Sequence, residues 1–143
     1  MSKKSAGAAL RVFTDQTDLN FISHCFGINA TQQHRKGDSI SKKNSQAGIF
    51  KESLWLYRSP LDGTKPLSEH IESILKLLEK SDANKSDANL KSLHDKGVSM
   101  DIFCVFSSES GQGSTEINAL LLQRLAKQQI SLIIDLYPPT ESE

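Results

Sequence analysis

The hydrophobic pattern is clearest between residues 98 and 137, where two alternating segments flank a leucine-rich stretch. Every second residue is apolar over 98–106, and the same alternation returns over 130–136. Such alternation is typical of strands that bury one face. The stretch between them, 118–127, is leucine-rich and predicts a helix. The pattern therefore predicts a strand–helix–strand unit whose two strands are parallel.

Further elements are predicted upstream of this unit. Residues 10–14 alternate as a short strand, and 19–26 predict a helix that ends where glycine permits a left-handed turn. Residues 49–57 predict a strand with large side chains on both faces. Residues 67–80 place apolar side chains at the three- and four-residue spacing of one buried helical stripe. A short helical piece, 90–96, follows.

This order of elements predicts one α+β domain over residues 9–137. We expect a two-layer sandwich, with a mixed sheet of four or five strands and about three helices mainly on one face, in β-α-β-α-β-α-β order. Residues 1–8 and 138–143 are predicted to be flexible ends. Segments 39–48 and 81–90 resemble surface insertions, and the second contains a tandem Ser-Asp-Ala-Asn repeat. The pattern leaves open whether they are ordered.

Composition narrows the class of protein. Seventeen basic and seventeen acidic residues cancel, so no global field attracts nucleic acid or an acidic membrane. The chain has neither a signal-peptide pattern nor an apolar run of membrane-spanning length. We therefore expect a cytoplasmic protein. Cys25 and Cys104 fall on a predicted helix and a predicted core strand, which favours buried, reduced thiols.

The spacing of reactive side chains does not match a catalytic or metal-binding motif. The four histidines lack metal-ligand spacing. The glycine-containing loop over residues 107–114 lacks the lysine of a phosphate-binding loop. Asp101 and Asp135 can form a carboxylate pair if their strands are neighbours, or each is simply polar on the outer face. We expect a non-enzymatic domain without metal or cofactor.

The densest polar cluster is a basic turn in the long connection over residues 29–48. Basic side chains beside a glycine can bind a phosphate or a carboxylate, because glycine lets backbone amides approach an anion. The alternative is a solvated turn whose aspartate neutralises the charge. An anion site here would form a pocket beside Trp55. The turn consists of His34, Arg35, Lys36, Gly37 and Asp38.

The positions out of phase with the core define a second candidate surface. If helices cover one side of the sheet only, its other face is a mixed apolar and charged patch, which is typical of partner sites. The alternatives are cover by the long loops or by a second copy of the chain. The predicted outer face consists of Arg11, Phe13, Asp101, Phe103, Val105, Ile133, Asp135 and Tyr137.

Several short motifs occur in the order found in a family of small bacterial domains of unknown function, which the chain resembles from about residue 10 to residue 137. The motifs are Phe26-Gly27, Ala30-Thr31, Arg35-Lys36-Gly37-Asp38, Leu54-Trp55, Leu67-Ser68-x-x-Ile71 and Ile134-Asp135-Leu136-Tyr137.

The resemblance supplies no activity, although some compact bacterial domains of this kind neutralise a toxin as immunity proteins. We therefore expect a protein-binding domain, with an immunity protein and its cognate toxin as the specific form. A sensor of small anions at the basic turn is the alternative. We expect a monomer or a homodimer.

Overall fold

The computed structural model describes residues 4–108 and 113–137, and within them the chain forms a five-stranded sheet with four α-helices. The strand order is β2-β3-β1-β4-β5. The α+β class is therefore confirmed. The elements in chain order are β1 (Lys4–Thr14), α1 (Leu19–Phe26), β2 (Gln32–His34), the short 3₁₀ helix η1 (Ser45–Ala47), β3 (Ser53–Arg58), α2 (Leu67–Asp82), α3 (Leu90–Asp95), β4 (Ser99–Ser108), α4 (Ala119–Lys127) and β5 (Ser131–Tyr137).

β1 is the central strand and sets the register of the sheet. It pairs antiparallel with β3 on one side and with β4 on the other, and β4 pairs parallel with β5. β1 is longer than the sequence predicts, because residues 4–8, which we expected to be a flexible end, pair with the second half of β4. Their small side chains gave too little alternation to reveal a strand.

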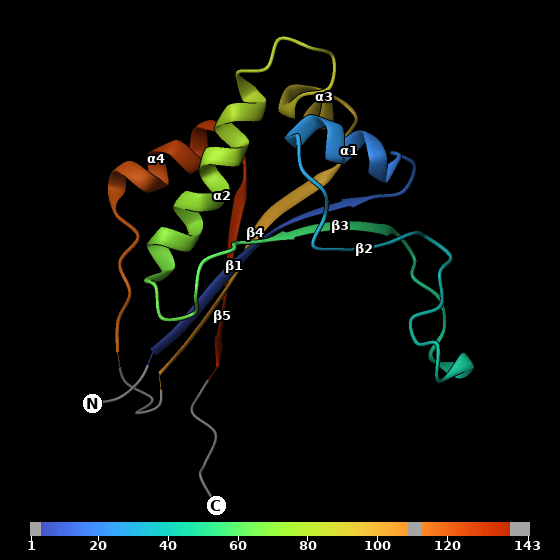
Figure 1. Cartoon of the computed structure of the whole chain (residues 1–143), viewed down its shortest axis with the longest axis horizontal. Helices are drawn as coiled ribbons and strands as arrows, with labels where there is room; N and C mark the ends of the chain where they lie inside the picture. The colour runs from blue at the N-terminus through green and yellow to red at the C-terminus, as the bar shows by residue number, and fades with distance from the viewer. Residues whose placement is uncertain (1–3, 109–112, 138–143) are drawn as a thin grey trace, which may run out of the picture.

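All four α-helices lie on one face of the sheet, as Figure 1 shows. The predicted stripe of α2 is fully buried in the main core, against the apolar side of β1 and β4. Figure 1 also shows the segment between β2 and β3 extending away from the helices. That segment, which contains the predicted insertion 39–48, holds η1 and an isolated bridge between Ser39 and Ile49.

The helix ends follow the expected capping chemistry. The side chain of Asp18 accepts a hydrogen bond from the Asn20 amide at the start of α1. Gly27 ends that helix at φ 68°, in the left-handed region. Asn118 caps α4 by accepting from the Leu121 amide. Asp18 and Gly27 thus mark the two ends of α1, and Asn118 marks the start of α4.

The second half of β5 differs from the prediction. Its in-phase residues Ile134 and Leu136, expected in the core, are 42% and 67% exposed. Leu121 and Leu125 of α4 belong to the main core together with Ile130, and Leu132 packs against it. Ile134 and Leu136 lie beyond the part of β5 that this core covers.

Candidate functional site

The eight predicted outer-face residues do share one face of the sheet. β1 and β4 place Arg11 directly across from Asp101. The parallel pairing of β4 with β5 places Phe103 beside Ile133, and Val105 beside Asp135. The main core lies on the opposite face, beneath the helices. The out-of-phase positions thus form one continuous surface across three neighbouring strands.

Arg11 is the centre of this surface. Its Nε and Nη2 donate to the two carboxylate oxygens of Asp101 at 2.7 and 2.8 Å, in a bidentate ion pair. Its guanidinium also lies over the rings of Phe103 and Phe13, with its central carbon 4.5 and 5.1 Å from the ring centroids. One arginine therefore fixes the positions of an acid and two aromatic rings.

Exposure increases across this face towards β5. Asp101 is buried beneath the guanidinium, whereas Phe103 and Val105 are half-buried. Ile133 is 40% exposed and Tyr137 is 53% exposed. A hydrogen bond to Asp135 raises the pKa of the Tyr137 phenol. The face therefore combines a rigid ion pair with accessible apolar and phenolic side chains.

Sequence reasoning missed the β3 portion of the same face. Ala9, Leu54 and Leu56 form a small apolar cluster with Phe13, separate from the main core. The register accounts for it, since Leu54 pairs with Phe13, and Leu56 with Arg11. The signal was present, because β3 has large residues at consecutive positions and must therefore present apolar side chains on both faces.

The two aspartates do not form a catalytic pair. They share a face, but Asp101 pairs with Ser131, four residues before Asp135 on β5. That offset corresponds to about 13 Å along the strand. Asp101 is also engaged by Arg11. This geometry supports the alternative reading, in which each carboxylate is a polar group of the outer face.

The backbone amides of the basic turn already donate hydrogen bonds to acceptors within the protein. The amide of Arg35 donates to the Asp38 carboxylate, and that of Asp38 donates to the Arg35 carbonyl. The Lys36 amide donates to the Ser53 hydroxyl, and the Gly37 amide donates to the Phe50 carbonyl. Gly37 does adopt a positive φ, 92°. The turn is therefore closed by protein acceptors, with the aspartate occupying the place of an anion.

The remaining residues of that predicted site lie apart from one another. Trp55 is fully buried in the main core, where its indole N–H donates to the Ser23 hydroxyl at 2.9 Å. His34 pairs with the neighbouring Leu54, so it belongs to the opposite face of the sheet. Its ring stacks on Phe50, with centroids 3.4 Å apart. A pocket shared by the turn and Trp55 is therefore not formed.

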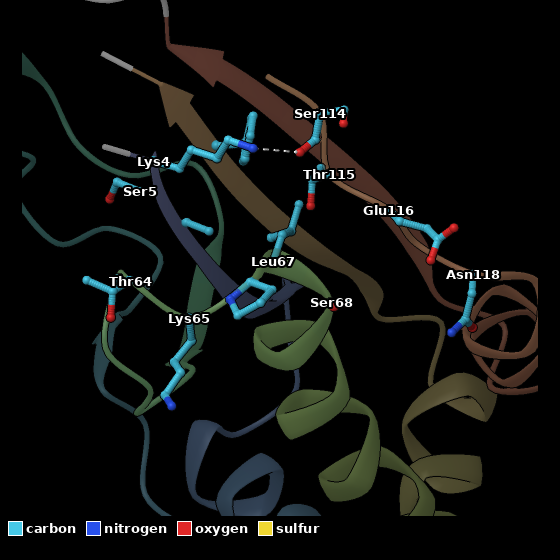
Figure 2. A pocket seen from close by; sticks show the side chains of 14 residues that line it. Lys4, Ser5, Thr64, Lys65, Leu67, Ser68, Ser114, Thr115, Glu116 and Asn118 are labelled. Carbon is cyan, nitrogen blue, oxygen red and sulfur yellow. Dashed lines mark hydrogen bonds between the residues drawn. The ribbon is translucent and has the colours of Figure 1, made fainter. Parts of the chain in front are cut away.

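A cavity of about 370 Å³ opens at the other end of the sheet. It lies between the start of β1, the start of α2 and the chain that leads into α4 (Figure 2). The Lys4 ammonium donates to the Ser114 carbonyl at 3.5 Å. The lining consists of Lys4, Ser5, Ala6, Gly63, Thr64, Lys65, Pro66, Leu67, Ser68, Phe106, Ser114, Thr115, Glu116 and Asn118.

The charged groups of this cavity do not converge. Figure 2 shows the Lys4 ammonium directed at Ser114, while the Lys65 side chain extends away from it and Glu116 lies on the far wall. The described lining holds hydroxyls but neither histidine nor cysteine. Its hydroxyls therefore have no histidine beside them as a general base, and its two lysines do not form a focused cationic site.

The two cysteines are free and buried, as predicted. Burial raises the pKa of the Cys25 thiol to about 11 and that of the Cys104 thiol to about 12. Both therefore remain protonated thiols near neutral pH and serve as small core side chains.

The fold and the outer face define a small α+β domain with helices on one side of its sheet and an ordered polar–aromatic surface on the other. The chain belongs to the family described as Domain of unknown function (DUF4279), whose match covers residues 3–139. The predicted membership of a family of unknown function is thereby confirmed. Neither the curated proteins nor the solved structures contain a match. Among the helices of residues 4–108 and 113–137, none has the length and apolar character needed to cross a membrane.

Proposed function

We propose that this domain binds a protein partner through the outer face of its sheet. The observation that carries the proposal is the arrangement around Arg11, where an ion pair and two rings are fixed on a face without helices. Arginine and aromatic side chains are the groups that dominate binding energy in protein interfaces. Because they are already held in place, binding costs little side-chain ordering.

The dimensions of the face suit a folded protein. The five strands contain 37 residues, since β1, β2, β3, β4 and β5 have 11, 3, 6, 10 and 7. At about 3.3 Å per residue along a strand and about 4.8 Å between strands, they give a face of about 600 Å². A standard interface buries about 800 Å² on each partner. We infer a partner with an apolar surface and hydrogen-bonding groups at its rim, since the charges at the centre of this face already neutralise each other.

The specific form of the proposal is an immunity protein whose partner is a bacterial toxin. Its support is the resemblance of the chain to small bacterial domains, some of which act in this way. The immunity role is tested by expressing the partner alone and together with this domain and comparing its toxicity. We expect coexpression to remove the toxicity. Persistent toxicity in the presence of a stable complex would exclude it and leave the binding role standing.

The alternative of an anion sensor at the basic turn has weaker support. The four amides of residues 35–38 donate to protein acceptors, and Trp55 lies on the other face. We expect phosphorylated metabolites to leave the melting temperature unchanged, and Arg35→Ala to make no difference in that assay. A stabilisation that Arg35→Ala removes would favour the sensor.

Site-specific photo-crosslinking tests the binding proposal. A photoreactive residue at position 105 or 133 lies on the outer face, and one at the exposed Lys76 of α2 serves as a control on the helical side. The captured protein is then purified and titrated against the domain. We expect a one-to-one complex that Ile133→Lys weakens at least tenfold, about 1.4 kcal/mol, and that Lys76→Glu leaves intact. A complex that Lys76→Glu disrupts, or no outer-face crosslink, would refute the proposal.

A further inference from the structure

The two edges of the sheet differ sharply in chemistry. β2, at one edge, has three residues, and all are polar: Gln32, Gln33 and His34. β5, at the other edge, has seven residues and a single charge, Asp135. Proteins normally protect an edge strand by making it short or charged. Among the described residues β2 meets that rule, whereas β5 does not.

β5 is also apolar and accessible on both sides of the sheet. Ile133 and Tyr137 are exposed on the outer face, and Ile134 and Leu136 on the helical face. Within the described chain β5 has one neighbour, the parallel strand β4. Alternate N–H and C=O groups of β5 therefore point away from β4 and can pair with a further strand. From this geometry we propose that two copies of the chain pair antiparallel through β5, about a two-fold axis at Ile134.

The sequence of β5 is complementary to itself in that register. An antiparallel two-fold at Ile134 places Leu132 across from Leu136 on the helical face. On the outer face it places Ile133 across from Asp135, and Ser131 across from Tyr137. A two-fold one residue later places the two Asp135 carboxylates directly opposite each other, which is unfavourable. Charge therefore disfavours that register, whereas the two-fold at Ile134 places apolar side chains opposite each other on the helical face.

Helix α4 extends the apolar contact. Arg124 binds Glu72 and Glu79 of α2, so this flank of α4 faces α2. Leu122 lies about 200° around the helix from Arg124, on the flank away from α2. Because α2 packs over β1 and β4, that flank is on the β5 side of the sheet. Leu122 is 48% exposed there, and in the pair it approaches the joint between the copies.

A second copy accounts for these features better than a foreign strand does. The whole chain has a formal net charge of zero, so two copies do not repel each other. A two-fold pairing uses the β5 edges of both copies and leaves the short polar β2 edges outermost, so assembly stops at the dimer. The result is a ten-stranded sheet with the two outer faces side by side. This inference goes beyond the proposed partner binding and does not depend on it.

Sedimentation velocity over a concentration series tests the dimer. We expect wild type to reach twice its 15.8 kDa mass at micromolar concentrations, and Ile134→Lys to remain monomeric because two lysines then meet at the axis. Gln123→Lys adds the same charge on the exposed side of α4 and should remain dimeric. A mixture of Ile134→Lys with Ile134→Glu should regain the dimer mass. Tryptophan fluorescence confirms that each variant is folded.

A cysteine pair gives an independent readout of the register. Two residues on the axis of an antiparallel pair have Cα atoms about 4.5–5.5 Å apart, within disulfide range. We expect Ile134→Cys to form an intermolecular disulfide under mild oxidation, and the exposed Ile49→Cys not to. Wild type that stays monomeric at about 200 µM would overturn the proposal, because its dimer affinity would then be weaker than the micromolar range expected here. A dimer formed by Ile134→Lys would also overturn it. Partner binding at the outer face is measured separately, so its failure is distinguishable.

Discussion

At the scale of single residues, Arg11 decides how the outer face is built. It neutralises a buried carboxylate and lies over two rings, and each of these contacts crosses between strands or between neighbouring rows of the sheet. The register of β1 with β4 brings Arg11 and Asp101 together although they are ninety positions apart in the sequence. A local sequence pattern cannot reveal such a pair, because it depends on which strands become neighbours.

Arg11→Ala should lower the free energy of unfolding by roughly 1–3 kcal/mol, because it leaves the Asp101 carboxylate buried without its charged partner. Arg11→Lys should recover part of that loss, since an ammonium keeps the charge but lacks the bidentate geometry. Urea unfolding followed through the single tryptophan, Trp55, measures both values.

The control for this prediction is a double-mutant cycle. Asp101→Ala should cost less in the Arg11→Ala background than in wild type, because the partner charge is already absent. Lys42→Ala, which removes an exposed cation, should leave stability nearly unchanged. Equal costs of Asp101→Ala in both backgrounds would show that the two side chains are not coupled.

Both thiols should be unreactive in the folded protein. Burial raises their pKa values to about 11 and about 12, so very little thiolate is present at pH 8. An absorbance assay with a thiol-specific disulfide reagent should detect two thiols in urea and almost none in buffer. Rapid labelling of one cysteine under native conditions would show that its surroundings open.

At the scale of elements, α2 connects the core to α4. Its buried stripe was readable from the sequence because the three- and four-residue spacing runs without interruption over the helix. Its polar side was only partly readable. Glu72 and Glu79 lie on the side that receives Arg124 from α4, at distances of 2.6 Å each. The hydrophobic stripe predicts the helix, but the contact of its polar side with α4 follows only from the packing.

The α2–α4 ion pairs predict a pH dependence of stability. Hydrogen bonding to Arg124 lowers the pKa of the Glu79 carboxyl below its ordinary 4.5. A lowered folded-state pKa means that the contribution is complete above pH 4.5 and is lost as the pH falls through the folded value. Arg124→Ala should therefore be less stable than wild type at pH 7, and the difference should shrink below pH 4.

Urea titrations at pH 7, 5 and 3.5 measure this dependence. Glu69→Gln serves as the matched control, because Glu69 is an exposed glutamate in the first turn of the same helix. We expect its effect to be small at all three pH values. A stability difference for Arg124→Ala that stays constant from pH 7 to pH 3.5 would contradict the assigned role of Glu79.

At the scale of the whole molecule, the sequence predicts the layers better than the sites. Alternation in β4 and β5 gave the strand–helix–strand unit and the outer-face residues, because side-chain direction in a strand depends on parity alone. It misplaced Ile134 and Leu136, because their exposure depends on how far α4 reaches over the sheet. It also overrated the basic turn, whose amides bond to Ser53 and Phe50, residues that are distant in the sequence.

The central claim is that one face of the sheet, the outer face, binds a protein. β5 offers a matched pair of positions for testing it: Ile133 and Ile134 are neighbours with nearly equal exposure, 40% and 42%, on opposite faces. The decisive measurement is a calorimetric titration of the crosslinked partner, once purified, into Ile133→Lys and into Ile134→Lys. We predict that Ile133→Lys binds the partner at least tenfold more weakly than wild type, about 1.4 kcal/mol. Each Ile134→Lys domain should bind the partner with wild-type affinity. Equal affinities for the two variants, or a larger loss for Ile134→Lys, would contradict the claim.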